Sequence, residues 1–262
     1  MHDLIAELLR EHPELRFRAL GAAPNRAALD LAPYGHPIEF LDAAAHRDWV
    51  DRYHRANLAR FPGPLTLPGW VLVDLYLMPA AVGLLTCPAR YLDVRPPGLG
   101  DDDEGVAAAY YAAPGITPGT VVGVSLISLR EGFGNAALIK AMTLKMLRAR
   151  VQRGIAQWSN RSLRVHTRFG PLRLEGFVPG PHGKENESFL YTVDLTDDAA
   201  LAEHMKRRHE ADPDAPEGAR WYDVEDLGSL GEILRRAASG ARIEILPPGL
   251  SADGKRVLVR HG

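Results

Sequence analysis

Hydrophobic and polar positions in the middle of the chain predict a strand followed by a helix, twice in succession. Residues 121–129 are mostly apolar (VVGVSLISL), a run typical of a strand buried on both faces. A glycine-rich turn at residues 130–136 leads into an apolar helical segment, residues 136–150. A second apolar run at residues 154–159 and a second helical segment at residues 160–169 follow. The predicted order is strand, glycine turn, helix, strand, helix.

Shorter periodic segments flank this central stretch. Upstream, apolar residues at helical spacing predict helices at residues 1–12 and 43–60. Upstream strands are predicted at residues 15–20, 37–41, 70–76, 80–86 and 106–112. Downstream strands are predicted at residues 172–178, 188–195, 242–246 and 256–259, with a strand or turn at 221–224. Downstream helices are predicted at residues 196–210 and 229–238, and residues 211–219 (ADPDAPEGA) have the composition of a linker.

Composition indicates an ordinary globular protein without a metal or disulfide framework. The 262 residues are 46% hydrophobic and 24% charged, with a formal net charge of −2. A single cysteine, Cys87, excludes an internal disulfide and a multi-cysteine zinc cluster. His36, His46 and His54 are spaced in a way that suits no common zinc motif, so we expect no metal.

The sequence also predicts a cytoplasmic location. No basic segment followed by an apolar core is recognisable as a secretory signal. The longest apolar run, residues 69–87, contains Asp74 and Pro79, which argues against a membrane span.

A local excess of positive charge changes this neutral picture. Residues 132–174 contain no Asp or Glu, but they contain nine basic residues: Lys140, Lys145, Arg148, Arg150, Arg153, Arg161, Arg164, Arg168 and Arg173. Free backbone N–H groups at a helix N-terminus attract anions, and a basic neighbourhood adds to that attraction. We therefore predict a site for a phosphate-bearing ligand at the 130–136 turn.

The turn and the second helical segment resemble a known family. The turn reads Arg-Glu-Gly-Phe-Gly-Asn-Ala, and residues 160–170 read NRSLRVHTRFG. Both are similar to motifs of the GNAT superfamily of acyl-CoA N-acyltransferases, in which an Arg/Gln-x-x-Gly-x-Gly/Ala loop holds the coenzyme A pyrophosphate. Three departures are visible: the loop is one residue shorter between Arg130 and Gly132, the second helical segment reaches Gly170 one residue early, and Pro171 instead of Phe follows Gly170.

The resemblance implies an α/β fold with a GNAT-like mixed, mostly antiparallel sheet flanked by helices. We expect this domain to cover residues 1–210, with the helix at 1–12 as an extension. A small C-terminal αβ appendage is expected at residues 211–262.

The implied activity is transfer of an acyl group from coenzyme A to a small-molecule amine, with acyl-CoA as co-substrate. The strand segment between Ile127 and Leu129 would pair with the pantetheine like an added strand. The remaining residues implied in coenzyme binding are Arg130, Gly132, Phe133, Gly134, Asn135, Ala136 and Asn160.

Three residues are candidates for the chemistry, each with an ordinary alternative. In the family, a residue of the second helix donates a proton to the leaving thiolate. The corresponding position in this chain is His166 when counted back from Gly170 and Thr167 when counted forward from Asn160. His166 is alternatively a surface histidine. Glu131 is a candidate base acting through a water, or a helix-start residue favoured by the dipole. Asp74 lies in an otherwise apolar predicted strand. A carboxylate buried there is either paired or protonated, and either state can serve a functional site. The alternative is an edge or bulge position, where the carboxylate has no special role.

Other nucleotide folds fit the glycine turn less well. A dinucleotide-binding unit needs a third glycine and an acidic residue about 20 positions on, where this chain has Gln152. A P-loop needs a Gly-Lys-Ser/Thr sequence that is absent here. The turn is alternatively no more than a tight connection.

Two rival functions stay open. One is a non-catalytic sensor of acyl-CoA or nucleotides that keeps the loop but lacks the acid and base. The other is a nucleic-acid-binding module, which the scarcity of aromatic residues in the basic segment disfavours. The acidic region after Asn186 neutralises the basic segment either within the fold or across a homodimer.

Overall fold

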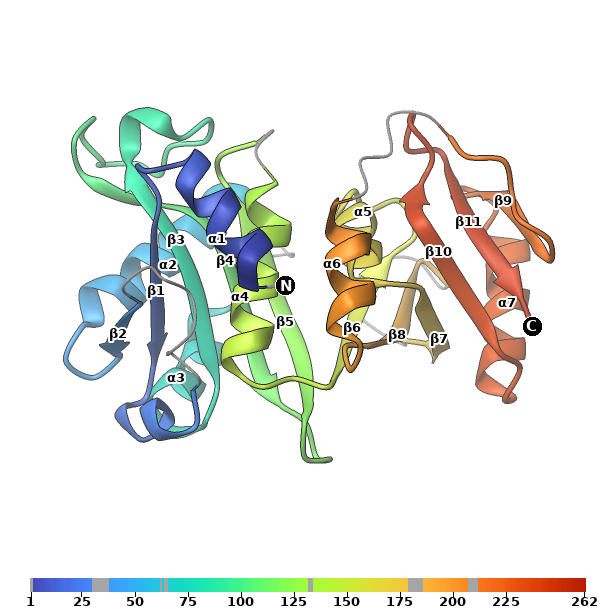
Figure 1. Ribbon diagram of the computed structural model, residues 1–262, viewed down its shortest axis with the longest axis horizontal. Helices are drawn as coiled ribbons and strands as arrows, with labels where there is room; N and C mark the ends of the chain where they lie inside the picture. Colours follow the sequence, from blue (N-terminus) through green and yellow to red (C-terminus); the bar gives the residue numbers. More distant parts are fainter. Residues whose placement is uncertain are drawn as a thin grey trace. The chain divides into compact units, whose positions relative to one another are not determined.

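The computed structural model divides the chain into two compact units, Met1–Ala149 and Arg150–Gly262 (Figure 1). It describes residues 2–29, 38–61, 63, 66–131, 134–178, 186–206 and 212–262. Both units combine strands with helices, which confirms the α/β class predicted from the sequence. The domain division at residue 210 stays a prediction.

The strands of the first unit lie in the order β2-β1-β3-β4-β5. Their bounds are β1 (Arg16–Gly21), β2 (Glu39–Asp42), β3 (Ala81–Pro88), β4 (Glu104–Pro114) and β5 (Thr120–Ser128). Among these described strands, β1 and β2 pair in parallel, and the other neighbours pair antiparallel. The sheet is therefore mixed and mostly antiparallel, as predicted.

The helical elements of this unit include the predicted N-terminal helix and the predicted helix at 43–60. Their bounds are α1 (His2–Glu11), η1 (Ala23–Ala27), α2 (Arg47–Arg60), η2 (Gly69–Val73), α3 (Asp74–Leu77), η3 (Ala89–Tyr91) and α4 (Asn135–Met146), where η marks a 3-10 helix. The apolar segment after the glycine turn thus forms a helix, and ten of its residues are buried.

Helices α4 and α2 cover opposite faces of the sheet. Successive side chains of a strand point to opposite faces, so Tyr110 and Tyr111 of β4 face different helices. The Tyr110 ring lies 5.9 Å from the Lys140 ammonium of α4, whereas Tyr111 faces Tyr53 of α2. Burial holds the pKa of Lys140 well below its usual value. Both faces of the long apolar strand β4 are buried as a result.

A glycine in β3 sets how closely α4 approaches the sheet. A Cβ atom at Gly83 would lie 2.0 Å from the Thr143 hydroxyl oxygen and 3.1 Å from a methyl carbon of Ile139. Any side chain at this position would therefore push the helix away from the strand.

The strand predicted at residues 121–129 is present as β5, but it is not buried on both faces. Val122 and Val124 are each 38% exposed, while Ile127 is 1% exposed. An apolar run indicates that a strand is compatible with burial, but it does not indicate how many of its faces are buried. The prediction that both faces of this strand are buried is therefore wrong.

The strand predicted at residues 70–76 is also wrong, because this segment forms η2 and α3. The buried residues Leu72 and Leu75 are three apart, which is a helical and not a strand period. Pro68 precedes the first turn, and its carbonyl accepts the first hydrogen bond, from the N–H of Val71. Proline is compatible with a helix start because its φ is already helical.

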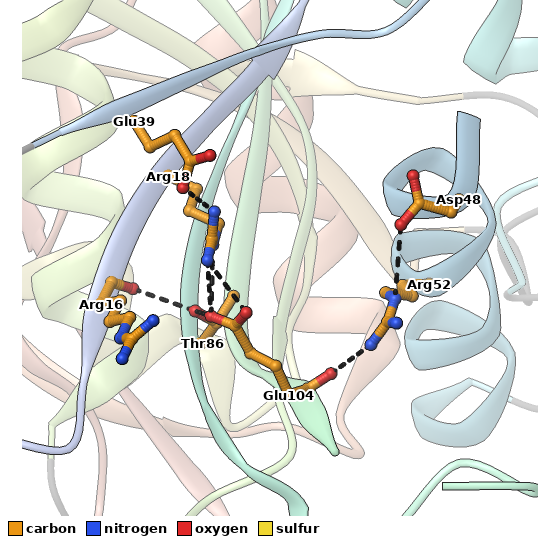
Figure 2. Close-up of polar contacts among 7 residues, drawn as sticks. All are labelled: Arg16, Arg18, Glu39, Asp48, Arg52, Thr86 and Glu104. Carbon is orange, nitrogen blue, oxygen red and sulfur yellow. Dashed lines mark hydrogen bonds and ion pairs between the residues drawn. The ribbon is translucent and has the colours of Figure 1, made fainter. Parts of the chain in front are cut away.

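A partly buried ion-pair network ties β1, β2, β3, β4 and α2 together (Figure 2). The guanidinium of Arg18 binds the Glu104 carboxylate and also contacts Glu39. The Thr86 hydroxyl donates to the same Glu104 carboxylate, and Arg52 donates to the Glu104 carbonyl. The network therefore holds the sheet and the α2 helix in a fixed register.

The strands of the second unit lie in the order β6-β8-β7-β10-β11-β9, with antiparallel pairs. Their bounds are β6 (Val151–Gln157), β7 (Leu172–Phe177), β8 (Ser188–Asp194), β9 (Ala219–Asp223), β10 (Ile243–Leu250) and β11 (Arg256–His261). The helical elements are α5 (Ser162–His166), η4 (Thr167–Phe169), α6 (Asp198–Lys206) and α7 (Leu227–Ala238).

The C-terminal αβ segment adds its strands to the sheet that contains β7. Glu244 and Ile245 of β10 pair with Arg173 and Leu172 of β7. Helix α7 packs on β7 through its buried apolar side, and Asp226 caps its start by accepting a hydrogen bond from the N–H of Ser229 at 3.0 Å.

Candidate functional site

The residues singled out from the sequence fall into both compact units. The first unit contains Asp74, Ile127, Leu129, Arg130, Glu131, Gly134, Asn135 and Ala136, and the second contains Asn160 and His166. Gly132 and Phe133 lie outside the described residues.

The start of α4 has the features of an anion site. Gly134 is the N-cap residue in a left-handed conformation, with φ 67° and ψ 11°, and no side chain caps the described helix start. The first turn, with Asn135 and Ala136, contains no acidic residue. The first N–H groups of a helix have no partner within the helix, so this end attracts negative charge.

Asn135 shapes the turn from inside. It is 2% exposed, and its amide nitrogen lies 3.3 Å from the carbonyl oxygen of Arg130, to which it donates. The Ser128 hydroxyl donates to the same carbonyl at 2.8 Å. Ser128 and Asn135 thus hold the Arg130 carbonyl, and neither side chain caps the start of α4.

Arg130 is held by the protein itself. Its guanidinium is 8% exposed and forms an ion pair with Glu14, and it lies 5.6 Å from the Tyr91 ring. Burial acts to raise the pKa of Glu14, but hydrogen bonds from Arg130 and the backbone, together with the charges of Arg130 and His12, outweigh it and hold that pKa below its usual value. The side chain of Arg130 thus has a structural partner, and its part in ligand binding stays a prediction.

Glu131 is exposed and faces α2. Its carboxylate pairs with Arg60 at 3.1 Å, and its N–H donates to the Asp93 carboxylate. Its assignment as a base stays a prediction.

The backbone of β5 is partly engaged with β4. Leu129 donates its N–H to the Ala107 carbonyl at 2.8 Å, and its own carbonyl accepts from the N–H groups of Asp93 and Val94. The N–H of Leu129 is thus already bonded within the protein. Backbone groups alternate along a strand, so the neighbouring Ser128 directs its N–H and carbonyl away from β4.

A β-bulge interrupts β5 upstream of this point. Tyr111 pairs with Ser125, but the next residue, Ala112, pairs with Gly123, so Val124 is an extra residue on β5. Bulges bend a strand, leave the extra residue out of the ladder and are frequent next to active sites.

Asp74 lies at the start of the short helix α3 and not in a strand. It is half-buried, and its carboxylate lies beside the Tyr111 hydroxyl. Burial and this neighbouring carboxylate both raise the pKa of Tyr111. The other polar residues on this face, Tyr53, Asn57 and Ser125, were missed from the sequence. Two tyrosines within an alanine-rich strand and an asparagine within a helix were the available signals.

In the second unit, His166 is buried, at 7% exposure, and its ring lies 5.3 Å from the Tyr191 ring. The alternative of a surface histidine is therefore wrong. The Thr167 hydroxyl is fully buried and donates to the Leu163 carbonyl at 2.9 Å. The Asn160 side chain accepts a hydrogen bond from the N–H of Ser162 at 2.8 Å, which shapes the entry into α5.

Metal and membrane features are absent from the described residues. No group of three or more His, Cys, Asp or Glu side chains in these ranges is arranged to hold a metal ion. None of the helices built from these residues has both the length and the apolar content that crossing a membrane requires.

No family model and no curated protein matches the chain. Solved structures similar to it include a candidate acetyltransferase from Acinetobacter baylyi, with 11% identity, coverage of 71% of this chain and 95% of that chain, and a TM-score of 0.40. Another is the candidate acetyltransferase yncA from Salmonella typhimurium with acetyl-CoA, at 16% identity, 68% and 97% coverage, and a TM-score of 0.38. A third is Arabidopsis thaliana NAA60 with a bisubstrate analogue, at 13% identity, 69% and 98% coverage, and a TM-score of 0.37.

The chain has an α/β fold. Its described elements follow the predicted order of strand β5, helix α4, strand β6 and helix α5, and its strand pairs are mostly antiparallel, with β1 and β2 parallel. The predicted α/β class with a mixed, mostly antiparallel sheet flanked by helices is therefore confirmed.

Proposed function

We propose that the protein is an acyl-CoA-dependent N-acyltransferase that transfers an acyl group from coenzyme A to an amine. The observation that supports this most directly is the start of α4, which no described side chain caps, with its left-handed Gly134 and its first turn free of carboxylates. In the GNAT superfamily, which the motif resembles, the turn at the corresponding position binds the diphosphate of coenzyme A.

The described residues fit this co-substrate. Backbone N–H groups of residues 134–136 are available at the helix end because no described side chain caps it. Gly134 keeps the approach open, since a glycine in the left-handed region leaves no Cβ in front of the amides. Gly132 and Phe133 are assigned to the same turn from the motif alone.

The chemistry assigned to the residues follows from the transfer itself. The amine nitrogen bonds to the thioester carbonyl carbon, the carbon–sulfur bond breaks, and the departing thiolate takes a proton. His166 is proposed as the donor of that proton, and Glu131 as the base that removes a proton from the amine through a water. A backbone N–H of β5 near the bulge would stabilise the developing oxyanion.

Binding is tested by thermal denaturation with coenzyme A and acetyl-CoA. At a ligand concentration 100 times the dissociation constant, binding stabilises a protein by about 2.7 kcal/mol. For a chain of this size that corresponds to a rise in melting temperature of roughly 5–10 °C.

A matched pair of variants locates the site. Gly134→Asp and Gly134→Asn have nearly the same shape, and both tolerate a left-handed backbone, but only the first places a negative charge at the helix start. The Asp variant should lose the coenzyme-induced shift and the Asn variant should keep most of it. Equal shifts for both variants would show that the diphosphate binds elsewhere.

Catalysis is tested by thiol release. Acetyl-CoA is mixed with the protein and a panel of amines, and free coenzyme A is measured. Thiol release that depends on an amine supports the transferase. A coenzyme-induced thermal shift without thiol release from any amine supports the rival, a non-catalytic sensor.

A further inference from the structure

We propose that Asp74 and four neighbouring polar residues recognise the acceptor as a cationic amine that has an apolar body and no carboxylate beside the amine. The four residues, called the polar cluster below, are Tyr53, Asn57, Tyr111 and Ser125. This inference rests on the proposed function, because an acceptor exists only if an acyl group is transferred.

The polar cluster is assembled from three elements on one face of the sheet. Helix α2 supplies Tyr53 and Asn57, β4 supplies Tyr111, and β5 supplies Ser125. Tyr111 and Ser125 are cross-strand neighbours, and the Asn57 amide donates to the Ser125 hydroxyl at 3.0 Å. The Asn57 carbonyl oxygen accepts from the N–H of Leu67 at 2.7 Å, which fixes the segment that leads to Asp74.

Two hydroxyls of the cluster have unused hydrogen-bonding capacity. Tyr53 and Tyr111 are 0% exposed, and neither hydroxyl completes a hydrogen bond of normal geometry within the described part of the chain. A buried polar group without a partner costs about 1–3 kcal/mol, and native proteins keep few of them. Polar groups of a ligand would complete these bonds.

Asp74 adds a negative charge next to these hydroxyls. Its carboxylate lies beside Tyr111, and no described Lys, Arg or His forms an ion pair with it. A half-buried carboxylate without a cation attracts a positively charged group and repels a second carboxylate. The charge on this face therefore distinguishes a simple amine from an α-amino acid.

Exposed apolar side chains flank Asp74. Trp70 and Leu77 are 75% and 76% exposed, and they stand four residues before and three residues after Asp74. This spacing places side chains on the same side of a helical segment. An exposed indole ring four residues from a carboxylate on a helical segment suits a cation with an apolar body, because the ring face attracts positive charge.

The cluster also lies on the strand that the proposed function assigns to the thioester. Ser125 is adjacent to the bulged residue Val124, and β5 continues from there to the turn before α4. An acceptor bound to the cluster would therefore lie along β5.

The binding test uses three compounds with one ring system: tryptamine, tryptophan and tryptophol. They carry an ammonium, an ammonium with a carboxylate, and neither charge, respectively. Calorimetric titration of the full chain, with and without coenzyme A, should show tryptamine binding at least tenfold more tightly than either of the other two. Equal affinities, or a preference for tryptophan, would overturn the inference.

Variants assign the effect to Asp74. Asp74→Asn should weaken tryptamine binding by about 10- to 100-fold, the range for a hydrogen bond to a charged group, and should remove the discrimination against tryptophan. Asp51→Asn removes the same charge from an exposed position on α2 and should change neither. Tyr111→Phe should weaken tryptamine binding several-fold without lowering the melting temperature, because it removes a buried hydroxyl that forms no hydrogen bond of normal geometry within the described part of the chain. Unchanged binding in Asp74→Asn would refute the assignment.

The two proposals fail in different ways. If Asp74→Asn keeps the acetyl-CoA thermal shift but loses tryptamine binding, the acceptor assignment is supported independently of turnover. If the parent protein binds tryptamine selectively but never releases thiol, the proposed transferase fails and the cation site remains. If thiol release occurs equally with tryptamine and tryptophan, the transferase stands and the acceptor assignment is wrong.

Discussion

Arg18 on β1 holds the carboxylate of Glu104 on β4 through two guanidinium nitrogens, although 86 residues separate them along the chain (Figure 2). The bonds from Nε and Nη2 measure 3.2 and 2.9 Å, and the Arg18 guanidinium lies 4.7 Å from the Trp49 ring of α2. Arg18 is 8% exposed, so its charge depends on this partner and on Glu39.

Glu104→Ala should therefore destabilise the first unit by about 2–4 kcal/mol, because it leaves a buried guanidinium with only the more exposed Glu39 as partner. The free energy of unfolding is measured in urea by tryptophan fluorescence. The control is Glu232→Ala, which breaks an exposed pair with Arg235 and should cost no more than about 0.5 kcal/mol. Equal effects of the two variants would show that the buried pair contributes no more than a surface pair.

Gly83→Ala should destabilise the protein by about 1–3 kcal/mol, because its methyl group would overlap the Thr143 hydroxyl of α4. Thr143→Ala alone should have a small effect, since it removes only the intrahelical bond to the Ile139 carbonyl. The double variant should recover part of the loss, and a double-mutant cycle measures this coupling. Strict additivity would show that the loss in Gly83→Ala does not arise from the overlap with the Thr143 hydroxyl.

The sequence predicted most of the sheet because its strands carry their own signal. The alanine- and tyrosine-rich strand β4 and the apolar run of β5 are continuous enough to be recognised without tertiary information. The segment around Asp74 was assigned wrongly because its apolar residues suit both a strand and a helix, and only the burial of Leu72 and Leu75 separates the two.

The candidate site was less predictable because its partners are distant in sequence. The helix start at Gly134 follows from a local motif and was identified. The pairing of Arg130 with Glu14 joins positions 116 residues apart, and no local pattern indicates it. The meeting of Tyr53 with Tyr111 depends likewise on the packing of α2 against β4, which the sequence alone does not specify.

Acid should weaken the second unit through Glu244, which is 7% exposed and bonded to Arg242 and Arg260. Burial acts to raise the pKa of Glu244, but hydrogen bonds and charges from both arginines outweigh it and leave that pKa below its usual value. A carboxylate with a lowered folded-state pKa stabilises the fold above its unfolded-state pKa, about 4.3, and this contribution is lost as the pH falls through the folded-state pKa.

Glu244→Gln should accordingly lower the free energy of unfolding by about 1–3 kcal/mol at pH 7, and this difference should shrink below about pH 4. Urea denaturation of both proteins between pH 7 and pH 3 measures it. The exposed Glu232→Gln serves as control and should show a much smaller difference throughout. A Glu244→Gln difference that stays constant down to pH 3 would contradict the ion-pair explanation.

His166→Gln tests the proposed proton donor. Glutamine keeps a polar group of similar reach beside Tyr191 but cannot act as a general acid near neutral pH, so the rate constant for thiol release should fall by about 100-fold or more. The acetyl-CoA thermal shift should be unchanged, because the diphosphate is assigned to the start of α4. His204→Gln, on helix α6 of the same unit, is the matched control and should retain the parental rate.

The pH profile of thiol release gives a second measurement of the same role. If His166 donates the proton, the rate of the parent protein falls as the pH rises, and this fall should be absent in His166→Gln. A loss below threefold with an unaltered pH profile would show that His166 serves the packing against Tyr191 and that the thiolate takes its proton from another source.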